Sequence, residues 1–212
     1  MYIYLTRHGQ TDWNAQKRTQ GVHNSHLSRL GICQAEELAE RLSSESISHL
    51  YSSPLDRAYQ TAVIVGKKYG IIPEKREELQ EINFGVWEGL TVNQIEKVYP
   101  GQLTRHRVDF TFAPENGESL QSLQRRICHF IEFIQRKHTD KDDKLLVTAH
   151  AYPIRMLIIE LMRFACRHLW DFQLDNTGIT IIHFESGKSR LICLNDTSHL
   201  SKGSYFNTSN QT

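Results

Sequence analysis

The sequence predicts an α/β protein with three layers, α/β/α, a mostly parallel central sheet and a small lid insertion. Short apolar runs typical of buried strands alternate along the chain with longer segments whose apolar residues recur at helical spacing. Such alternation is typical of a parallel sheet covered by helices on both faces. The chain has 212 residues, enough for one domain with a substantial core. We therefore expect a single domain over residues 1–200 and a loose polar tail over residues 201–212.

The composition argues against several classes of partner. The chain is 39% hydrophobic and 23% charged, and its formal net charge is +1, so we expect neither nucleic acid nor a membrane surface as a partner. No apolar run is long enough to span a membrane, and the first residues read as a strand rather than a signal peptide. The four cysteines have no metal-binding or disulfide spacing. We expect free thiols, a cytoplasmic location and no cofactor, with monomer or homodimer left open.

The first element expected is a buried strand over Tyr2–Leu5, followed by Arg7 and His8 and ended at Gly9. In open α/β sheets, ligands bind at the carboxyl ends of strands. Arginine offers a planar fork of donors suited to phosphate, and a histidine ring nitrogen can act as a nucleophile. The strand end therefore suggests a phosphate site with His8 as nucleophile, although Arg-His-Gly alone is more often an ordinary turn and needs support from other segments.

The elements up to residue 69 are expected as follows. Residues 11–26 are too polar for the core and too long for a tight turn, so we expect a functional loop. Ser28 is a suitable N-cap for a helix. The buried face of that helix is expected to hold Ala35, Leu38, Ala39 and Leu42. A short strand over Ile47–Tyr51 follows, and then Pro54 opens a helix that runs to about Tyr69.

The middle of the chain is less regular. Residues 79–89 mix aromatic residues, glycines and two carboxylates without a helical or strand period, so we expect a structured loop over a cleft. Thr91 and Gln94 form a capping-box pair for a short helix. Residues 101–118 are the least regular part, and we interpret them as the lid.

The last third returns to alternating helices and strands. Ser119 is expected to cap a long helix. The apolar stripe of that helix, which we assign to the core, consists of Leu120, Leu123, Ile127, Phe130, Ile131 and Ile134. Lys144–His150 is the strongest strand pattern and ends on a histidine. Pro153 starts a helix that runs to about Met162, and residues 178–194 read as a hairpin.

Three basic residues from separate segments are expected at one edge of the sheet. His8 and His150 each follow a strand, and Arg57 lies in the first turn of a helix, where the helix dipole disfavours a positive charge. A solvated surface arginine is one explanation, and an anion bound at the helix end is the other. The convergence of the three segments favours the anion.

Five stretches occur in this order along the chain: Leu5–Thr11 with Asn14, Tyr51–Ala58, Glu81–Gly89, Gly117–Ser119 and His150. Together they resemble the R-H-G-x-T-x-x-N signature, the second arginine motif, the acid/base glutamate loop and the second histidine of the histidine phosphatase superfamily, phosphoglycerate mutase-like branch. The resemblance covers nearly the whole chain and is strongest to broad-specificity phosphatases of small phosphate monoesters. One departure is that Ala151 and Tyr152 follow His150, where the family usually has glycine.

The phosphate site expected from these residues is a clamp. Positioning and charge carry most of the catalysis of phosphoryl transfer, so we assign Arg7 and Arg57 to the non-bridging oxygens, with His150 beside them. The resemblance implies further donors to phosphate from Asn14, Gln20 and Gly21. Ala151 can still offer its backbone N–H, whereas Tyr152 adds bulk that bears on substrate preference.

Two residues are expected to do the chemistry. His8 must attack as a neutral ring, held in one tautomer by a hydrogen bond that the Gly9 carbonyl can accept. Glu81 is the expected general acid and then general base, and it needs a raised pKa. Glu88 is the rival carboxylate, which we interpret as structural. The remaining histidines, including His106, are expected at the surface or in packing.

The predicted function is a metal-independent phosphatase that hydrolyses small phosphorylated metabolites through a phosphohistidine. We expect no metal, because the arginines take the role of a cation and no H-E-x-x-H motif occurs. One alternative is a phosphoglycerate mutase primed by 2,3-bisphosphoglycerate. Others are a narrower α-ribazole phosphate or phosphoserine phosphatase, and a catalytically silent module that binds a phosphorylated metabolite.

Overall fold

A computed structural model describes residues 1–201 of the chain. Apart from Ser201, the expected polar tail lies outside the described residues. Within residues 1–201 no helix is both long enough and apolar enough to cross a membrane. The four cysteines are free, as predicted.

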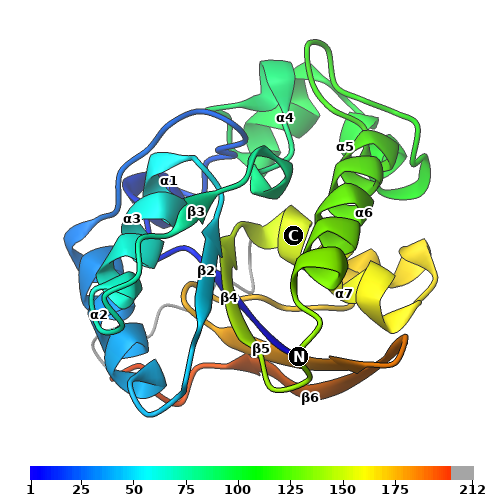
Figure 1. The fold of residues 1–212 in the computed structure, drawn as a ribbon. Helices are drawn as coiled ribbons and strands as arrows, with labels where there is room; N and C mark the ends of the chain where they lie inside the picture. Colours follow the sequence, from blue (N-terminus) through cyan, green and yellow to red (C-terminus); the bar gives the residue numbers. More distant parts are fainter. Residues whose placement is uncertain (202–212) are drawn as a thin grey trace.

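A six-stranded mixed sheet forms the middle layer (Figure 1). Its strands lie in the order β3 (Glu74–Lys75), β2 (His49–Ser52), β4 (Lys144–Ala149), β1 (Tyr2–Arg7), β5 (Ile179–Glu185) and β6 (Lys188–Asp196). The first four strands are parallel to one another, and the β5–β6 hairpin adds two strands at one edge, with β5 antiparallel to β1 and β6 antiparallel to β5. The prediction of a mostly parallel sheet is confirmed.

Helices cover both faces of this sheet. In chain order they are α1 (Asp12–Ala15), α2 (Arg29–Leu42), α3 (Asp56–Gly66), α4 (Val92–Val98), α5 (Gln102–Val108), α6 (Leu120–Lys137) and α7 (Ala151–Met162). Helices α2 and α3 pack on one face, and α6 and α7 pack on the other (Figure 1). Neighbouring residues of β4 show this division. Leu146 belongs to the core beneath α2 and α3, whereas Leu145 and Val147 belong to the core beneath α6 and α7. The three-layer prediction is confirmed.

The predicted helix caps are present. Ser28 and Ser119 accept backbone N–H bonds from the first turns of α2 and α6. Thr91 and Gln94 form the reciprocal capping box of α4. At these three helices a short polar side chain directly before the first turn marks the start, whereas the N-cap of α3 is Leu55, which makes no side-chain cap.

Three predicted boundaries are wrong. Helix α3 begins at Asp56, because Leu55 stays extended, and it ends at Gly66. Helix α7 begins at Ala151, so that Pro153 is its third residue, where the missing proline N–H costs no intrahelical bond. Residues 11–26 and the expected lid each contain a helix that the sequence did not reveal, α1 and α5. The only buried residue of α5 is His106, so α5 lacks the apolar stripe by which a helix is recognised.

Candidate active site

His8 and His150 lie side by side beyond the ends of the two central strands. Strands β1 and β4 pair in parallel with Arg7 opposite Ala149, so the residues one step further meet at the same edge. The His8 N–H donates to the Ala149 carbonyl at 3.0 Å. The two imidazole ring centroids are 5.1 Å apart. Two adjacent strands therefore place two histidines at one point of the carboxyl edge.

The His8 ring is neutral and fixed in one tautomer. Its Nδ1 lies 2.7 Å from the Gly9 carbonyl oxygen, which can only accept, so Nδ1 carries the proton. This confirms the hydrogen bond predicted for Gly9 and leaves the lone pair on Nε2. Burial, and then the charges of Arg57 and Arg7, hold the pKa of His8 well below its ordinary value. A neutral ring with a free Nε2 is the form of histidine that can act as a nucleophile.

Arg57 is buried in the first turn of α3, so the surface explanation is wrong. Its side chain is 1% exposed, and its Nη1 and Nη2 donate to the carbonyls of His23 at 2.9 Å and Gly21 at 2.6 Å. Its Nε is buried and has no hydrogen-bond partner within residues 1–201. Burial lowers the pKa of Arg57 to about 10, which still leaves it cationic at neutral pH. A buried cation with an unsatisfied donor is suited to an anionic ligand.

Glu88 binds the backbone N–H groups of the segment whose carbonyls Arg57 contacts, residues 21–23. Its carboxylate accepts the N–H of Val22 at 2.8 Å and of His23 at 3.1 Å. A Cβ on Gly21, whose φ is +57°, would lie 1.9 Å from the Glu88 Oε1, so this approach requires glycine. Residues 21–23 are thus held between the Arg57 guanidinium and the Glu88 carboxylate. Glu88 does not line the pocket, in keeping with its interpretation as structural.

The other predicted phosphate ligands surround the two histidines. Arg7 donates from Nη1 to the Leu174 carbonyl at 2.9 Å, and burial lowers its pKa to about 10. Asn14 and Gln20 turn their side-chain oxygens to Thr11, at 3.0 Å for each, which leaves the Gln20 amide nitrogen available as a donor. Ala151 is the first residue of α7, at the positive end of the helix dipole.

His150 is buried beside Ser53. Its Nε2 lies 2.8 Å from the Ser53 hydroxyl, and its Nδ1 has no hydrogen-bond partner in the part of the chain that the structure describes. Burial, followed by the charge of Arg57, lowers the pKa of His150 well below its ordinary value. Unliganded, the ring is therefore neutral, and a dianion nearby would favour its protonated form.

Glu81 reaches the same pocket from the segment before η2 (Gly85–Trp87). Its side chain is buried, and its Oε1 accepts the N–H of Ile82 at 3.0 Å and of Tyr152 at 3.3 Å. Burial raises the pKa of Glu81 above its ordinary value, against the opposing effects of the Ile82 hydrogen bond, Arg57 and Arg7. Glu81 therefore keeps a proton to higher pH than an exposed glutamate does.

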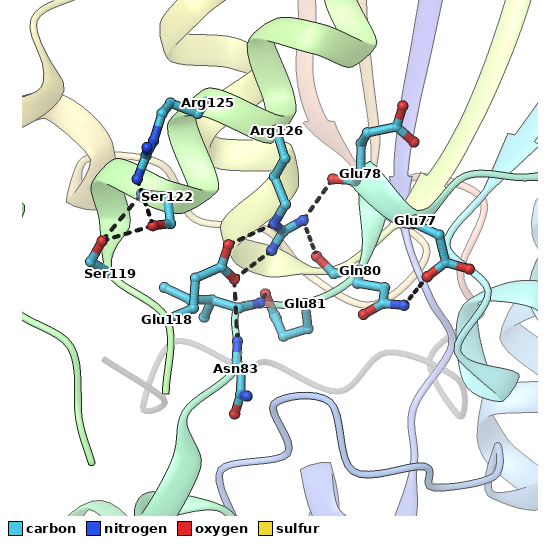
Figure 2. A network of polar contacts seen from close by, with 11 residues as sticks. Glu77, Glu78, Gln80, Glu81, Asn83, Glu118, Ser119, Ser122, Arg125 and Arg126 are labelled. Atoms are coloured by element: carbon cyan, nitrogen blue, oxygen red, sulfur yellow. Dashed lines mark hydrogen bonds and ion pairs between the residues drawn. The ribbon is translucent and has the colours of Figure 1, made fainter. Parts of the chain in front are cut away.

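A polar network rooted in α6 holds the backbone on both sides of Glu81 (Figure 2). Arg126 donates to the carbonyls of Glu78 at 2.6 Å and Gln80 at 2.7 Å, and to both carboxylate oxygens of Glu118 at 2.8 and 2.9 Å. Glu118 in turn exchanges hydrogen bonds with the backbone of Asn83. The role of Arg126 could not be predicted from the sequence, because hydrogen bonds to backbone carbonyls far away in the chain produce no recognisable sequence motif.

The pocket has a volume of about 830 Å³ and extends beyond the phosphate ligands to an aromatic wall. Tyr152 packs edge-on against Phe84, with ring centroids 5.1 Å apart, and against Trp170, at 5.6 Å. His106 of α5 is 2% exposed and lies within the same wall, and burial lowers its pKa to about 4. His106 packs, as the sequence suggested, but it does so at the site. A histidine in a short helix without an apolar stripe gave no sign of this position.

Within residues 1–201, one group of side chains has ligand atoms close enough for a metal. These atoms of His49, His138 and Asp143 lie within 4.8 Å of one another. The group sits at the opposite edge of the sheet, where β2 and β4 begin. Both ring nitrogens of His138 already have partners, Tyr51 at 2.7 Å and Asp143 at 3.2 Å. It takes no part in the pocket.

Comparison with known proteins gives a consistent picture. The family model described as "Histidine phosphatase superfamily (branch 1)" matches residues 3–197. Phosphoserine phosphatase 1 of Hydrogenobacter thermophilus is 32% identical over 203 residues, 93% of each chain. Glucosyl-3-phosphoglycerate phosphatase of Mycobacterium tuberculosis is 42% identical over 117 residues, which cover 55% of this chain and 52% of that one.

The solved structures agree with the sequence relatives. The structure of the mycobacterial glucosyl-3-phosphoglycerate phosphatase in complex with VO3 superposes with a TM-score of 0.86 at 31% identity, over 92% of this chain and 99% of the other. The match of the family model to nearly the whole chain, and relatives that are phosphatases by name, lead to one conclusion. The chain belongs to branch 1 of the histidine phosphatase superfamily and is a phosphoric monoester hydrolase.

Proposed function

We propose that His8 and Glu81 carry out the hydrolysis of small phosphate monoesters in two steps, with a phosphohistidine between them. The observation that carries this proposal is the His8 ring, neutral and with a free Nε2, beside two buried arginines. The Glu81 carboxyl, whose pKa is raised by burial, supplies the matching acid.

In the first step, the His8 Nε2 attacks phosphorus and the bond from phosphorus to the leaving oxygen breaks. Glu81 gives its proton to that oxygen, so an alcohol departs and a phosphohistidine remains. The non-bridging oxygens are held by Arg7, Asn14, Gln20, Gly21, Arg57, His150 and Ala151. Because these groups are buried and fixed before the substrate arrives, the charge that develops needs little reorganisation of the site.

In the second step, Glu81, now a carboxylate, takes a proton from a water molecule that attacks phosphorus. The bond from phosphorus to Nε2 breaks, and inorganic phosphate and neutral His8 are released. Glu81 therefore alternates between acid and base, and the Arg126–Glu118 network that fixes its segment keeps it in reach for both steps (Figure 2).

The proposal extends to the chain around the site. Residues 1–200 act as one domain, and residues 101–118 act as a lid, since α5 brings His106 and Arg107 to the pocket.

The protein works in the cytoplasm on a small phosphorylated metabolite, as a monomer or homodimer. Free cysteines support that location. Phosphoserine and glucosyl-3-phosphoglycerate are the first metabolites to assay, because relatives are named for them.

The test is phosphate release from a panel of small monoesters, with a chelator present and no bisphosphoglycerate added. We expect turnover, and rapid quenching with ³²P-labelled substrate should trap an acid-labile, base-stable phosphoenzyme. His8→Asn should abolish the trapped label. Label retained in that variant would refute the nucleophile assignment. Activity only with added 2,3-bisphosphoglycerate would indicate a mutase, and tight phosphate binding without turnover would indicate the silent module.

A further inference from the structure

Arg155 is a buried guanidinium that the phosphate clamp does not use. It lies on α7, one turn after Tyr152, and is 8% exposed. Its Nε donates to the Phe172 carbonyl at 3.0 Å. Its two terminal nitrogens make no hydrogen bond or ion pair with the residues described, and the side chain lines the pocket. Burying a guanidinium without a partner for its fork is costly, so an arginine held this way is suited to an anionic ligand.

Among residues 1–201, no carboxylate makes an ion pair or hydrogen bond with Arg155. Its guanidinium carbon lies 6.0 Å from the Tyr152 ring centroid and 5.9 Å from that of Trp170. Arg107 of α5 stands 5.7 Å from the same Trp170 ring. Glu81 is the acid whose charge reaches Arg155, and it is neutral when protonated for the first step. The far end of the pocket therefore has excess positive charge.

Arg155 lies between the phosphate ligands and the wall at Tyr152: beyond the effect of burial, its charge helps to lower the pKa of Arg7, and its guanidinium faces the Tyr152 ring. The Tyr152 N–H donates to Glu81 Oε1, and Glu81 is the group that meets the leaving oxygen. Residues three apart on a helix share a face, so Arg155 continues the wall that begins at Tyr152. Arg7 and Arg57 already match the two negative charges of a phosphate monoester. Arg155 is therefore left to match a third negative charge, elsewhere on the substrate.

We propose that Arg155 binds a carboxylate on the leaving group, so that the preferred substrates are phosphate monoesters of hydroxy carboxylic acids. The two terminal nitrogens of one guanidinium match the two oxygens of one carboxylate. The exposed Arg107 adds a weaker, salt-screened attraction at the rim. This inference rests on the proposed phosphatase function and names the substrate class for it.

A matched pair of substrates tests the proposal. 3-Phosphoglycerate and glycerol 3-phosphate differ only in bearing a carboxylate or a hydroxymethyl group at the far carbon. The wild-type kcat/KM should favour 3-phosphoglycerate by at least about tenfold, as expected when a buried polar group goes unpaired in the poorer complex. This comparison needs no variant. Equal kcat/KM values for the two would overturn the proposal.

Variants then locate the preference. Arg155→Gln should bring the ratio of the two kcat/KM values close to one, mainly by raising KM for 3-phosphoglycerate. Arg155→Lys, which keeps the charge but not the fork, should give an intermediate ratio. Arg163→Gln is the matched control, since Arg163 ends the same helix, is exposed and donates to the Gly187 carbonyl. An Arg155→Gln enzyme that melts like the wild type and keeps its preference would also overturn the proposal.

Failure of the proposed function gives a different result. If wild-type enzyme turned over neither substrate nor p-nitrophenyl phosphate, the phosphatase mechanism would fail. Calorimetric binding of the two substrates would then decide the role of Arg155 by itself. Tighter binding of 3-phosphoglycerate that disappears in Arg155→Gln would support the carboxylate site, and equal affinities would exclude it.

Discussion

Burial shifts the pKa values of His8 and Glu81 in opposite directions, and in each residue it favours the neutral form. It lowers the pKa of the histidine and raises the pKa of the carboxylic acid, because a low-dielectric site disfavours either charge. A neutral nucleophile and a protonated acid are what the first step of hydrolysis requires. The two protonation states follow from one physical cause, so no separate device is needed for each residue.

Glu81→Gln tests the acid at the scale of one side chain. For an alkyl phosphate, kcat/KM should fall about 10²–10⁴-fold, because the departing alkoxide then receives no proton. For p-nitrophenyl phosphate the fall should be much smaller, since its leaving group is stable as an anion. Steady-state kinetics on both substrates provide the measurement. Equal losses on the two would remove Glu81 from the role of acid.

The pH profile should carry the same signature. Glu81 must be protonated for the first step, so kcat/KM should decline as the pH rises through its raised pKa. In Glu81→Gln this alkaline decline should disappear. A profile of the same shape in both enzymes would assign the titration to another group.

The buried His106 should make the free energy of unfolding depend on pH. Its pKa is about 4 in the folded chain and about 6.5 in an unfolded one. Between these values the unfolded state binds the extra proton, so the free energy of unfolding should fall as the pH is lowered through this window. The loss should reach roughly 3 kcal/mol by pH 4. Urea unfolding from pH 7 to pH 4 should show a shallower decline in His106→Phe, and an unchanged decline would contradict this.

At the scale of elements, the site depends on how α6 is joined to the segment that carries Glu81. Arg126→Gln removes the four hydrogen bonds by which Arg126 connects α6 to this segment, two to backbone carbonyls and two to Glu118. We expect kcat to fall about tenfold with KM little changed, because Glu81 is misplaced while the phosphate ligands stay. Stability should fall by about 1–3 kcal/mol.

The neighbouring arginine is the control for that prediction. Arg125 is exposed and contacts only the Ser122 hydroxyl among the groups drawn in Figure 2. Arg125→Gln changes the same charge one position away and should leave both kcat and the midpoint of unfolding unaltered. Equal losses of kcat and stability in the two variants would show that net charge, and not the hydrogen bonds of Arg126, is responsible for them.

A close backbone contact joins α2 to the turn after His8. A Cβ on Gly31 would lie 2.0 Å from the Gln10 carbonyl oxygen, so Gly31→Ala must push the helix and the turn apart. We expect destabilisation by about 1–3 kcal/mol and weaker binding of inorganic phosphate. Cys33→Ala, at an exposed position of the same helix, is the control. Normal phosphate affinity in Gly31→Ala would mean that the turn does not depend on this contact.

At the scale of the whole molecule, the sequence predicted what periodicity and strand ends determine. Strand burial patterns revealed the parallel core, and the residues directly beyond β1 and β4 could be assigned to one edge. Arg126, His106 and Arg155 were missed as site residues. Arg126 and Arg155 act on distant backbone carbonyls, and His106 replaces the apolar residue that would have marked α5. Contacts of this kind depend on the folded path and leave no local pattern.

The central place of β1 and β4 in the sheet has a consequence for how activity is lost. Amide hydrogens in the middle of a sheet exchange with solvent only when the molecule unfolds globally. The two histidines follow the two innermost strands, so the part of phosphate binding that they supply should persist up to the denaturant concentration at which the fold itself is lost. Turnover, which also needs the Glu81 segment outside the sheet, should disappear at a lower concentration. A partly denatured enzyme would then still sequester phosphate esters that it no longer cleaves.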